Sequence, residues 1–313
     1  MICETVLDAV GGTPLVSLRR MTGPEDAQVL VKFEGVNVGG SVKTRTACKM
    51  IEEAERRGDL KPGSIIVEPT SGNQGVGLAL VAAVKGYQAR IIMPDSCSEE
   101  RRKIMQHYGA EVVMVHDDGD IGACIQECIA LAGRMAAEDP RVFVPQQFVN
   151  RDNLAAHIQG TAAEILADTQ AAGITVDGFC SGFGTGGTIT GIGSELRKVN
   201  PAVQIWAAEP EHAALLSGGA IGTHVQMGIG DGILPAIMDT SLIDEIVVVT
   251  DDDALACARR LAREEGLLCG ISSGTNVACA LRMAHQLGPG KTVVTLAPDT
   301  GERYFSTVLF EGE

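Results

Sequence analysis

Short apolar runs alternate with longer amphipathic stretches along almost the whole chain. The runs have the length of buried strands, and the stretches between them have the period of helices that cover a sheet. The pattern predicts strands at residues 29–33, 65–68, 90–93, 111–115, 176–180, 204–208, 245–249 and 292–296. It predicts helices at residues 41–57, 76–85, 98–109, 154–168, 188–199, 251–265 and 275–287, with Ser41 and Ser98 as caps. Repeated βα units of this kind indicate parallel sheets with right-handed crossovers.

Length and composition support an α/β fold. A chain of 313 residues is long enough for one large domain or two smaller ones. Hydrophobic residues make up 45% of it but aromatic residues only 4%, so the core must consist mainly of aliphatic side chains. Such cores are typical of parallel sheets covered by helices. The best candidate for a crossing between two domains is the segment 145–153.

The charge and the cysteine usage exclude several classes of partner. A formal net charge of −15 argues against nucleic acid and against anionic membranes, which both require a basic face. The densest basic run, Arg101, Arg102 and Lys103, follows two glutamates and is interpreted as a solvated helix face. The nine cysteines include no CxxC pair, and the six histidines lack metal-binding spacing. We therefore expect reduced thiols, no metal site and a cytoplasmic protein.

Four loops are unusually rich in Gly, Ser, Thr and Asn, at residues 39–45, 70–75, 181–188 and 270–274. The strongest of them is the sequence GTGGT at 184–188, which lies between a predicted strand and a predicted helix. Its backbone N–H groups could hold an anion at the positive end of the helix dipole, which predicts a phosphate cup. The plainer interpretation is a glycine turn that lets the helix pack closely on the strand.

A second function is compatible with the same loop. Gly182, Gly184 and Gly187 satisfy GxGxxG, and Glu209 follows at the end of the next predicted strand. That arrangement is typical of dinucleotide binding, which keeps a nicotinamide-dependent oxidoreductase open. The dinucleotide hypothesis explains none of the other three loops.

Lys43 and the loop after the second strand provide further candidate chemistry. Lys43 lies in the first turn of a predicted helix, where the dipole disfavours a cation. Desolvation there would lower its pKa, as a Schiff-base amine requires, although most lysines are simply solvated. The loop at 70–75 suits recognition of a carboxylate by backbone N–H groups and hydroxyls. Its alternative interpretation is ordinary capping by Ser71 or Asn73.

Together the loops resemble the cysteine synthase (O-acetylserine sulfhydrylase) family, in the group that includes cystathionine β-synthase. The matching stretches, in the family's order, are residues 12–16 (GTPLV), 41–45 (SVKTR), 68–73 (EPTSGN), 100–103 (ERRK), 146–148 (QQF), 184–188 (GTGGT), 228–230 (GIG), 270–274 (GISSG) and 301–304 (GERY). They cover nearly the whole chain, and the combination is far more specific than any one of them.

The resemblance implies a pyridoxal 5'-phosphate enzyme. Lys43 would bind the cofactor covalently, Asn73 would contact the ring oxygen and Ser272 would face the pyridine nitrogen. The residues implied for the phosphate are Gly184, Thr185, Gly186, Gly187 and Thr188. Those implied for the amino-acid substrate are Thr70, Ser71, Gly72, Asn73, Gln74, Gln147 and Gly230.

The implied reaction is β-replacement through an aminoacrylate intermediate. Lys43 would take the α-proton of the substrate, the β-substituent would leave, and sulfide would add. The expected product is cysteine, made from O-acetyl-L-serine.

The resemblance also implies a fold of type II, with the cofactor in a cleft between two α/β domains. The smaller, mobile domain would comprise residues 40–145, and the larger one residues 1–39 plus 146–313. A homodimer is expected, and a candidate partner is the tail of a serine acetyltransferase in the cleft.

Two residues depart from the family's pattern. Gln74 stands where the family usually has Thr, and Asp231 stands where cysteine synthases usually have a small apolar residue. Asp231 is either an exposed loop residue or a carboxylate that points into the cleft as a general base. In the second case the enzyme would release hydrogen sulfide from L-cysteine, or join two thiols. A catalytically silent, partner-binding homologue is a further alternative, against which the presence of Lys43, Asn73 and Ser272 together argues.

Overall fold

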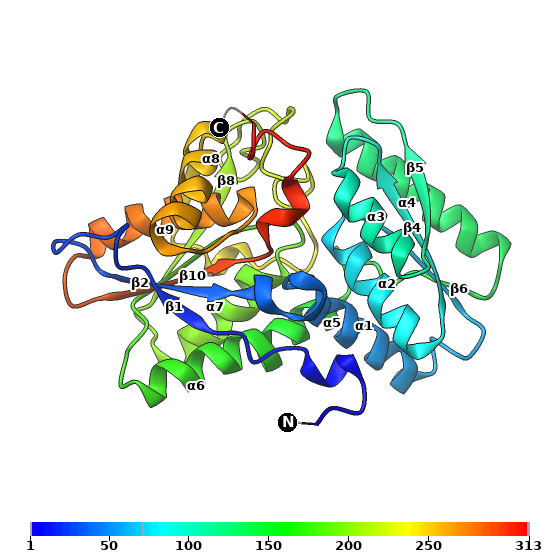
Figure 1. Ribbon diagram of the computed structural model, residues 1–313, viewed down its shortest axis with the longest axis horizontal. Coiled ribbons are helices and arrows are strands. Elements are labelled where there is room, and N and C mark those ends of the chain that lie inside the picture. Colours follow the sequence, from blue (N-terminus) through cyan, green and yellow to red (C-terminus); the bar gives the residue numbers. More distant parts are fainter. Residues whose placement is uncertain (1, 71, 312–313) are drawn as a thin grey trace.

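The computed structural model describes residues 2–70 and 72–311, in which two sheets are flanked by helices (Figure 1). The larger sheet has the strand order β1-β2-β10-β7-β8-β9, and the smaller one has the order β5-β4-β3-β6. The larger sheet consists of β1 (Leu15–Ser17), β2 (Gln28–Phe33), β7 (Gly178–Gly182), β8 (Gln204–Pro210), β9 (Glu245–Val249) and β10 (Thr292–Ala297). The smaller sheet consists of β3 (Ile65–Pro69), β4 (Gln88–Pro94), β5 (Glu111–Val115) and β6 (Val142–Phe143).

Nearly all neighbouring strands run parallel. The β1–β2 pair is antiparallel, whereas the pairs β10–β2, β10–β7, β7–β8 and β8–β9 are parallel. In the smaller sheet β3 pairs with β4 and β6, and β4 with β5, all in parallel. The predicted fold class of mostly parallel sheets flanked by helices is confirmed.

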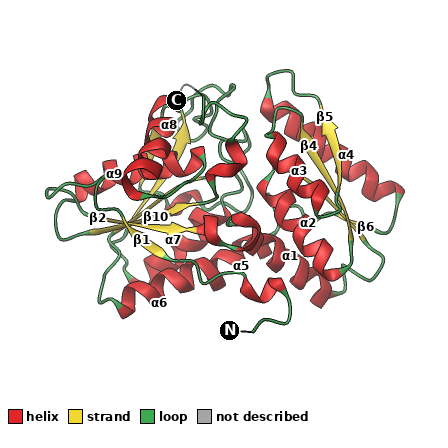
Figure 2. Ribbon diagram, in the orientation of Figure 1, coloured by secondary structure: helices red, strands yellow, loops and turns green. Residues whose placement is uncertain are grey.

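Helices cover both sheets (Figure 2). Those around the smaller sheet are α1 (Lys43–Arg57), α2 (Asn73–Lys85), α3 (Glu99–His107) and α4 (Ile121–Glu138). The others are α5 (Arg151–Ala156), α6 (Ala163–Ala171), α7 (Gly187–Val199), α8 (Asp251–Arg260) and α9 (Ile271–Leu287). Single π-helical turns at His157–Ala162 and Leu261–Glu265 continue α5 and α8. None of the helices in the described residues is both long and apolar enough to cross a membrane.

The start of α9 differs from the prediction. The sequence at 270–274 is poor in helix formers and was expected to be a loop, but Ile271 begins the helix. A Cβ atom on Gly274 would collide with the carbonyl oxygen of Ala254 in α8. Close packing of α8 on α9 therefore requires the glycine, and tertiary contact outweighs the low helix propensity.

Two other predictions about elements need correction. Ser41 does not cap α1, because Val42 occupies the cap position and makes no side-chain hydrogen bond there. The chain between the predicted strand at 111–115 and residue 154 contains α4 and β6, neither of which the pattern predicted. The start of α4 is fixed by Asp120, whose side chain accepts a hydrogen bond from the backbone N of Ala123 (3.0 Å).

Glu68 fastens the segment that leaves the smaller sheet after β6. Its fully buried carboxylate accepts hydrogen bonds from the backbone N atoms of Gln146 and Gln147, both at 2.8 Å. Gln146 adopts a left-handed conformation (φ 62°), which is uncommon for a residue other than glycine. Burial raises the pKa of Glu68 to about 7, although both hydrogen bonds favour the ionised form.

This raised pKa predicts a pH dependence of stability. Between pH 4.5, the ordinary value, and about pH 7, the unfolded chain has lost the Glu68 proton while the folded chain keeps it. The free energy of unfolding should therefore contain a component that falls as pH rises through this window, by at most about 1.4 kcal/mol per pH unit. The Glu68→Gln variant, which cannot titrate, should lack this component in urea denaturation between pH 4.5 and 8. Identical pH profiles for the two proteins would contradict the prediction.

Candidate active site

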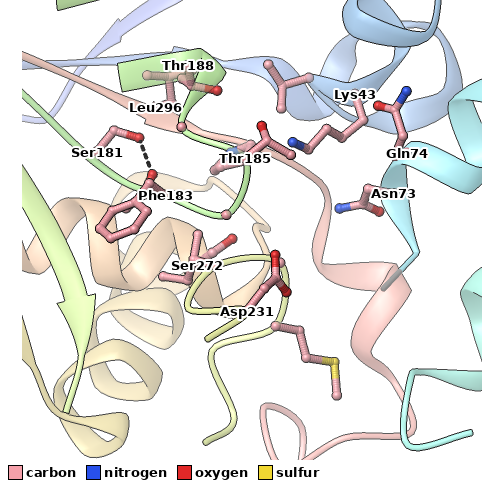
Figure 3. A pocket seen from close by; sticks show the side chains of 18 of the residues that line it. Lys43, Asn73, Gln74, Ser181, Phe183, Thr185, Thr188, Asp231, Ser272 and Leu296 are labelled. Atoms are coloured by element: carbon pink, nitrogen blue, oxygen red, sulfur yellow. Dashed lines mark hydrogen bonds between the residues drawn. The ribbon is translucent and has the colours of Figure 1, made fainter. Parts of the chain in front are cut away.

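The loops after several parallel strands meet in one cavity between the two sheets, which we call the inner cavity (Figure 3). It brings together most of the residues that the sequence singled out. These are Lys43, Thr70, Asn73, Gln74, Gln147, Gly184, Thr185, Gly186, Thr188, Asp231 and Ser272. Parallel strands present their carboxyl ends at the same edge of a sheet, which is where ligands of α/β proteins bind.

The remaining predicted residues lie around this cavity. Gly187 is the first residue of α7, and Gly72 is the N-cap of α2. Gly230 lines an adjoining outer cavity, and its backbone N donates to the carbonyl oxygen of Phe183 (3.0 Å). Ser71 lies outside the described residues.

Lys43 begins α1, and its side chain extends across the inner cavity toward Thr185 (Figure 3). Burial lowers the pKa of this amine, and the nearby Asp231 carboxylate opposes the shift. A lowered pKa provides the neutral amine that attack on a carbonyl requires. The direction of the shift is the one that its place at a helix N-terminus predicted.

The loop between β7 and α7 has the geometry of an anion cup. Gly186 caps α7 in a left-handed conformation (φ 75°), and the first N–H groups of a helix have no acceptor within the helix and can bind an anion. Asn153 Nδ2 donates to the Thr185 hydroxyl (3.0 Å) and holds it in place. A Cβ atom on Gly184 would come within 2.8 Å of the Gly228 carbonyl oxygen and 2.9 Å of Asp231 Oδ2. The close approach of these two loops requires glycine at position 184.

His157 contacts the Thr188 side chain of the cup, and sequence reasoning did not predict this contact. Its Nε2 lies 3.2 Å from the hydroxyl of Thr188, and its Nδ1 lies 3.1 Å from that of Thr161. Burial, together with the charges of Lys43 and Arg45, lowers the pKa of His157 well below its ordinary value. The ring is therefore neutral and orients the Thr188 hydroxyl.

Two polar side chains complete the wall on the side away from the cup. Ser272 lies in the first turn of α9 and presents its hydroxyl to the cavity (Figure 3). The amide of Asn73 is held at both ends: Nδ2 donates to Asp299 (2.6 Å), and Oδ1 accepts from Arg303 Nη1 (2.9 Å). A cup for an anion, a buried amine and a hydroxyl on one cavity wall fit a phosphorylated pyridine aldehyde.

Asp231 is half-buried and points into the inner cavity (Figure 3). Burial raises the pKa of its carboxyl, and the interactions with the neighbouring Lys43 and His224 oppose that shift. Asp231 also lines the outer cavity, together with Ser98, Glu99 and His224. The carboxylate therefore stands where the two cavities meet.

Arg101 was assigned wrongly from the sequence. The run 101–103 was expected to be a solvated helix face, but Arg101 is 1% exposed and lines the inner cavity. Arg102 and Lys103 do lie at the surface, in ion pairs with Glu99. One signal was available, because Arg101 lies in the ERRK stretch that the family resemblance had matched.

The structure removes the support for a dinucleotide site. Glu209 does follow at the end of β8, but it is fully buried. Its carboxylate accepts hydrogen bonds from the backbone N atoms of Leu216 and Ser217 and from the Ser217 hydroxyl. An acidic residue occupied in this way is not available to a ribose. Within residues 2–70 and 72–311, no three metal-binding side chains gather in one place.

Comparison with known proteins defines the class. The chain belongs to the family of pyridoxal-phosphate dependent enzymes, whose pattern matches residues 6–299. The cofactor implied by the sequence is thereby confirmed, and the chain is an enzyme of this class.

Individual relatives support the cysteine synthase resemblance. A cysteine synthase of Staphylococcus aureus is 46% identical over 307 residues, which cover 98% of this chain and 97% of that protein. The crystal structure of O-ureido-L-serine synthase superposes with a TM-score of 0.93 at 42% identity, covering 100% of this chain and 96% of that one. A hydrogen sulfide-producing enzyme from Fusobacterium nucleatum superposes with a TM-score of 0.91 at 40% identity, covering 97% of this chain and 100% of that one. The chain is thus similar to cysteine synthases over its whole length.

The cup geometry predicts the effect of one added methyl group. Gly184→Ala should push the cup away from the 228–231 loop and weaken the binding of pyridoxal phosphate at least about 10-fold. Titration of the apoprotein with the cofactor measures this affinity. Gly133→Ala is the matched control, because a Cβ atom there meets nothing within 4 Å. Equal cofactor affinity in Gly184→Ala and wild type would contradict the geometry.

Proposed function

We propose that the protein is a pyridoxal-phosphate-dependent cysteine synthase, which makes L-cysteine from O-acetyl-L-serine and sulfide. The observation that carries the proposal is the half-buried Lys43 side chain, whose amine extends toward the anion cup with a lowered pKa. The 46% identity to a cysteine synthase over nearly the full length of both chains supports the substrate pair.

The residues around the inner cavity have different roles in the proposed reaction. The bound cofactor supplies the electron sink that stabilises negative charge at the substrate's α-carbon. Lys43 takes the α-proton, and its lowered pKa suits that general base. Thr70, the backbone at 71–74 and Gln147 bind the substrate's carboxylate, while Ser272 faces the pyridine nitrogen. Because the side chain of Ser272 is a neutral hydroxyl, the pyridine ring of the cofactor is a weaker electron sink here than it would be beside a carboxylate. A weaker electron sink suits β-elimination.

A second activity is favoured by the position of Asp231. A carboxylate at the junction of the inner and outer cavities, with a raised pKa, is suited to accept a proton from an incoming thiol or water. The candidate activity is β-replacement on L-cysteine with release of hydrogen sulfide. The likeness to a hydrogen sulfide-producing enzyme at 40% identity supports it.

The same proposal includes the organisation of the molecule. Residues 40–145 form a smaller domain that closes on the substrate, and residues 1–39 with 146–313 form a larger one that holds the cofactor's phosphate. All four strands of the smaller sheet lie between residues 65 and 143, which supports the division. The enzyme is a cytoplasmic homodimer, and the tail of a serine acetyltransferase is a candidate occupant of the cleft.

Replacement of Lys43 tests the proposed chemistry. The Lys43→Ala variant should lose the visible absorbance of the bound cofactor and at least about 1,000-fold in the rate of cysteine formation. Lys49→Ala is the control on the same helix. The ammonium of Lys49 forms an ion pair with Glu53 (2.9 Å), so its loss should leave the cofactor in place. Spectra and assays of cysteine formed from O-acetyl-L-serine and sulfide measure both effects. Full activity in Lys43→Ala would refute the role of this lysine.

Replacement of Asp231 separates the two activities. Asp231→Asn should slow sulfide release from L-cysteine about 100-fold, because a general base usually contributes a rate factor of this size. Cysteine formation from O-acetyl-L-serine should change little, because hydrosulfide is already deprotonated and needs no base. If both rates are unchanged, or if both fall equally, Asp231 does not serve as the base for a thiol.

A further inference from the structure

A cluster of mostly charged side chains joins α3 to the segment after β10, and its member Arg101 lines the inner cavity. We call Arg101, Asp299, Arg303 and Tyr304 the arginine cluster. Arg101 comes from α3, and the other three follow β10. Arg101 Nη2 lies 3.6 Å from Asp299 Oδ2, and its guanidinium carbon lies 4.7 Å from the centre of the Tyr304 ring. The Tyr304 hydroxyl donates to Asp299 Oδ2 (2.8 Å).

The cluster contains an excess of positive charge. Arg101, Asp299 and Arg303 are 1%, 0% and 5% exposed, so water screens none of them well. Within residues 2–70 and 72–311, Arg101 forms an ion pair with Asp299 alone, and Arg303 forms none. A buried surplus charge is costly unless an anion compensates it.

Arg101 also has unused hydrogen-bonding capacity. Its Nη1 approaches the sulfur of Met227 (3.3 Å), a weak acceptor. Its Nε and Nη2 find no hydrogen-bond partner among the described residues. Buried donors of this kind cost free energy until a ligand or water satisfies them.

The position of Arg101 relates it to the loop at 70–74. A Cβ atom on Gly72 would collide with Arg101 Cδ, so the stem of the arginine packs directly against the backbone of that loop. Arg101 and Thr70 both line the inner cavity. The positive charge therefore lies immediately behind the backbone groups proposed to bind the substrate's carboxylate.

We infer that Arg101 is a specificity-determining residue that selects substrates bearing a free carboxylate, and that Asp299 and Tyr304 are positioning residues for its guanidinium. The inference deepens the proposed function and rests on it. The surplus charge attracts the carboxylate to the loop at 70–74, and Asp299 reduces that charge while it fixes the geometry. The competing interpretation is that the cluster has only a structural role and holds α3 against the segment after β10.

Steady-state kinetics with O-acetyl-L-serine separate the two interpretations. Arg101→Met should raise KM about 10-fold or more with little change in kcat, and Arg101→Lys should recover part of the loss. Asp299→Asn removes the partner that positions the guanidinium and should also raise KM, by less than Arg101→Met does. If the cluster only holds α3 in place, Arg101→Met should lower the free energy of unfolding and leave KM unchanged, which would overturn the inference.

A pair of ligands keeps the test independent of turnover. L-Alanine and L-alaninamide lack a leaving group and differ in the carboxylate, so their binding to the cofactor-loaded protein can be followed by absorbance. Wild type should prefer L-alanine, and Arg101→Met should lose about 10-fold for L-alanine but little for L-alaninamide. Equal losses for both ligands, or a wild type without preference, would overturn the inference whether or not cysteine forms. Failure of the proposed function would instead appear as a wild type that forms no cysteine.

Discussion

The site depends on limiting the contact of the Lys43 amine with bulk water. Burial lowers the pKa of that amine, and the backbone around it makes burial possible: glycine at 184 lets the cup and the 228–231 loop approach each other. The same burial raises the pKa of Asp231, while each of the two groups favours the charged form of the other. The same cavity therefore lowers the pKa of an amine and raises the pKa of a carboxyl. Both shifts are in the direction that proton transfer near neutral pH requires.

The two sheets contribute different parts of this enclosure. The larger sheet provides the cup, Asp231 and Ser272, and the smaller unit provides Asn73 and Arg101. Several contacts that join them are polar, such as Asn73 with Asp299 and the Ser306 hydroxyl donating to Glu100 (2.8 Å). Polar contacts of this kind can break and re-form with small changes in free energy. They suit the closing movement that we propose for the smaller domain.

Sequence reasoning predicted the parts of the site that depend on local backbone chemistry. The cup at 184–188 and Lys43 at a helix N-terminus were predicted because each signal lies within a few neighbouring residues. Arg101 was misassigned because its burial depends on Tyr304 and Asp299, about two hundred residues further along the chain. The start of α9 was missed for a similar reason, since Gly274 is needed only where Ala254 of α8 packs against it.

The central claim is that Lys43 holds the cofactor, and covalent trapping tests it most directly. The purified protein is incubated with pyridoxal phosphate, reduced with borohydride and digested, and the labelled peptide is identified by mass spectrometry. We expect one cofactor per chain, attached to Lys43. Stoichiometric labelling of another lysine, or no labelling at all, would contradict the assignment of the site.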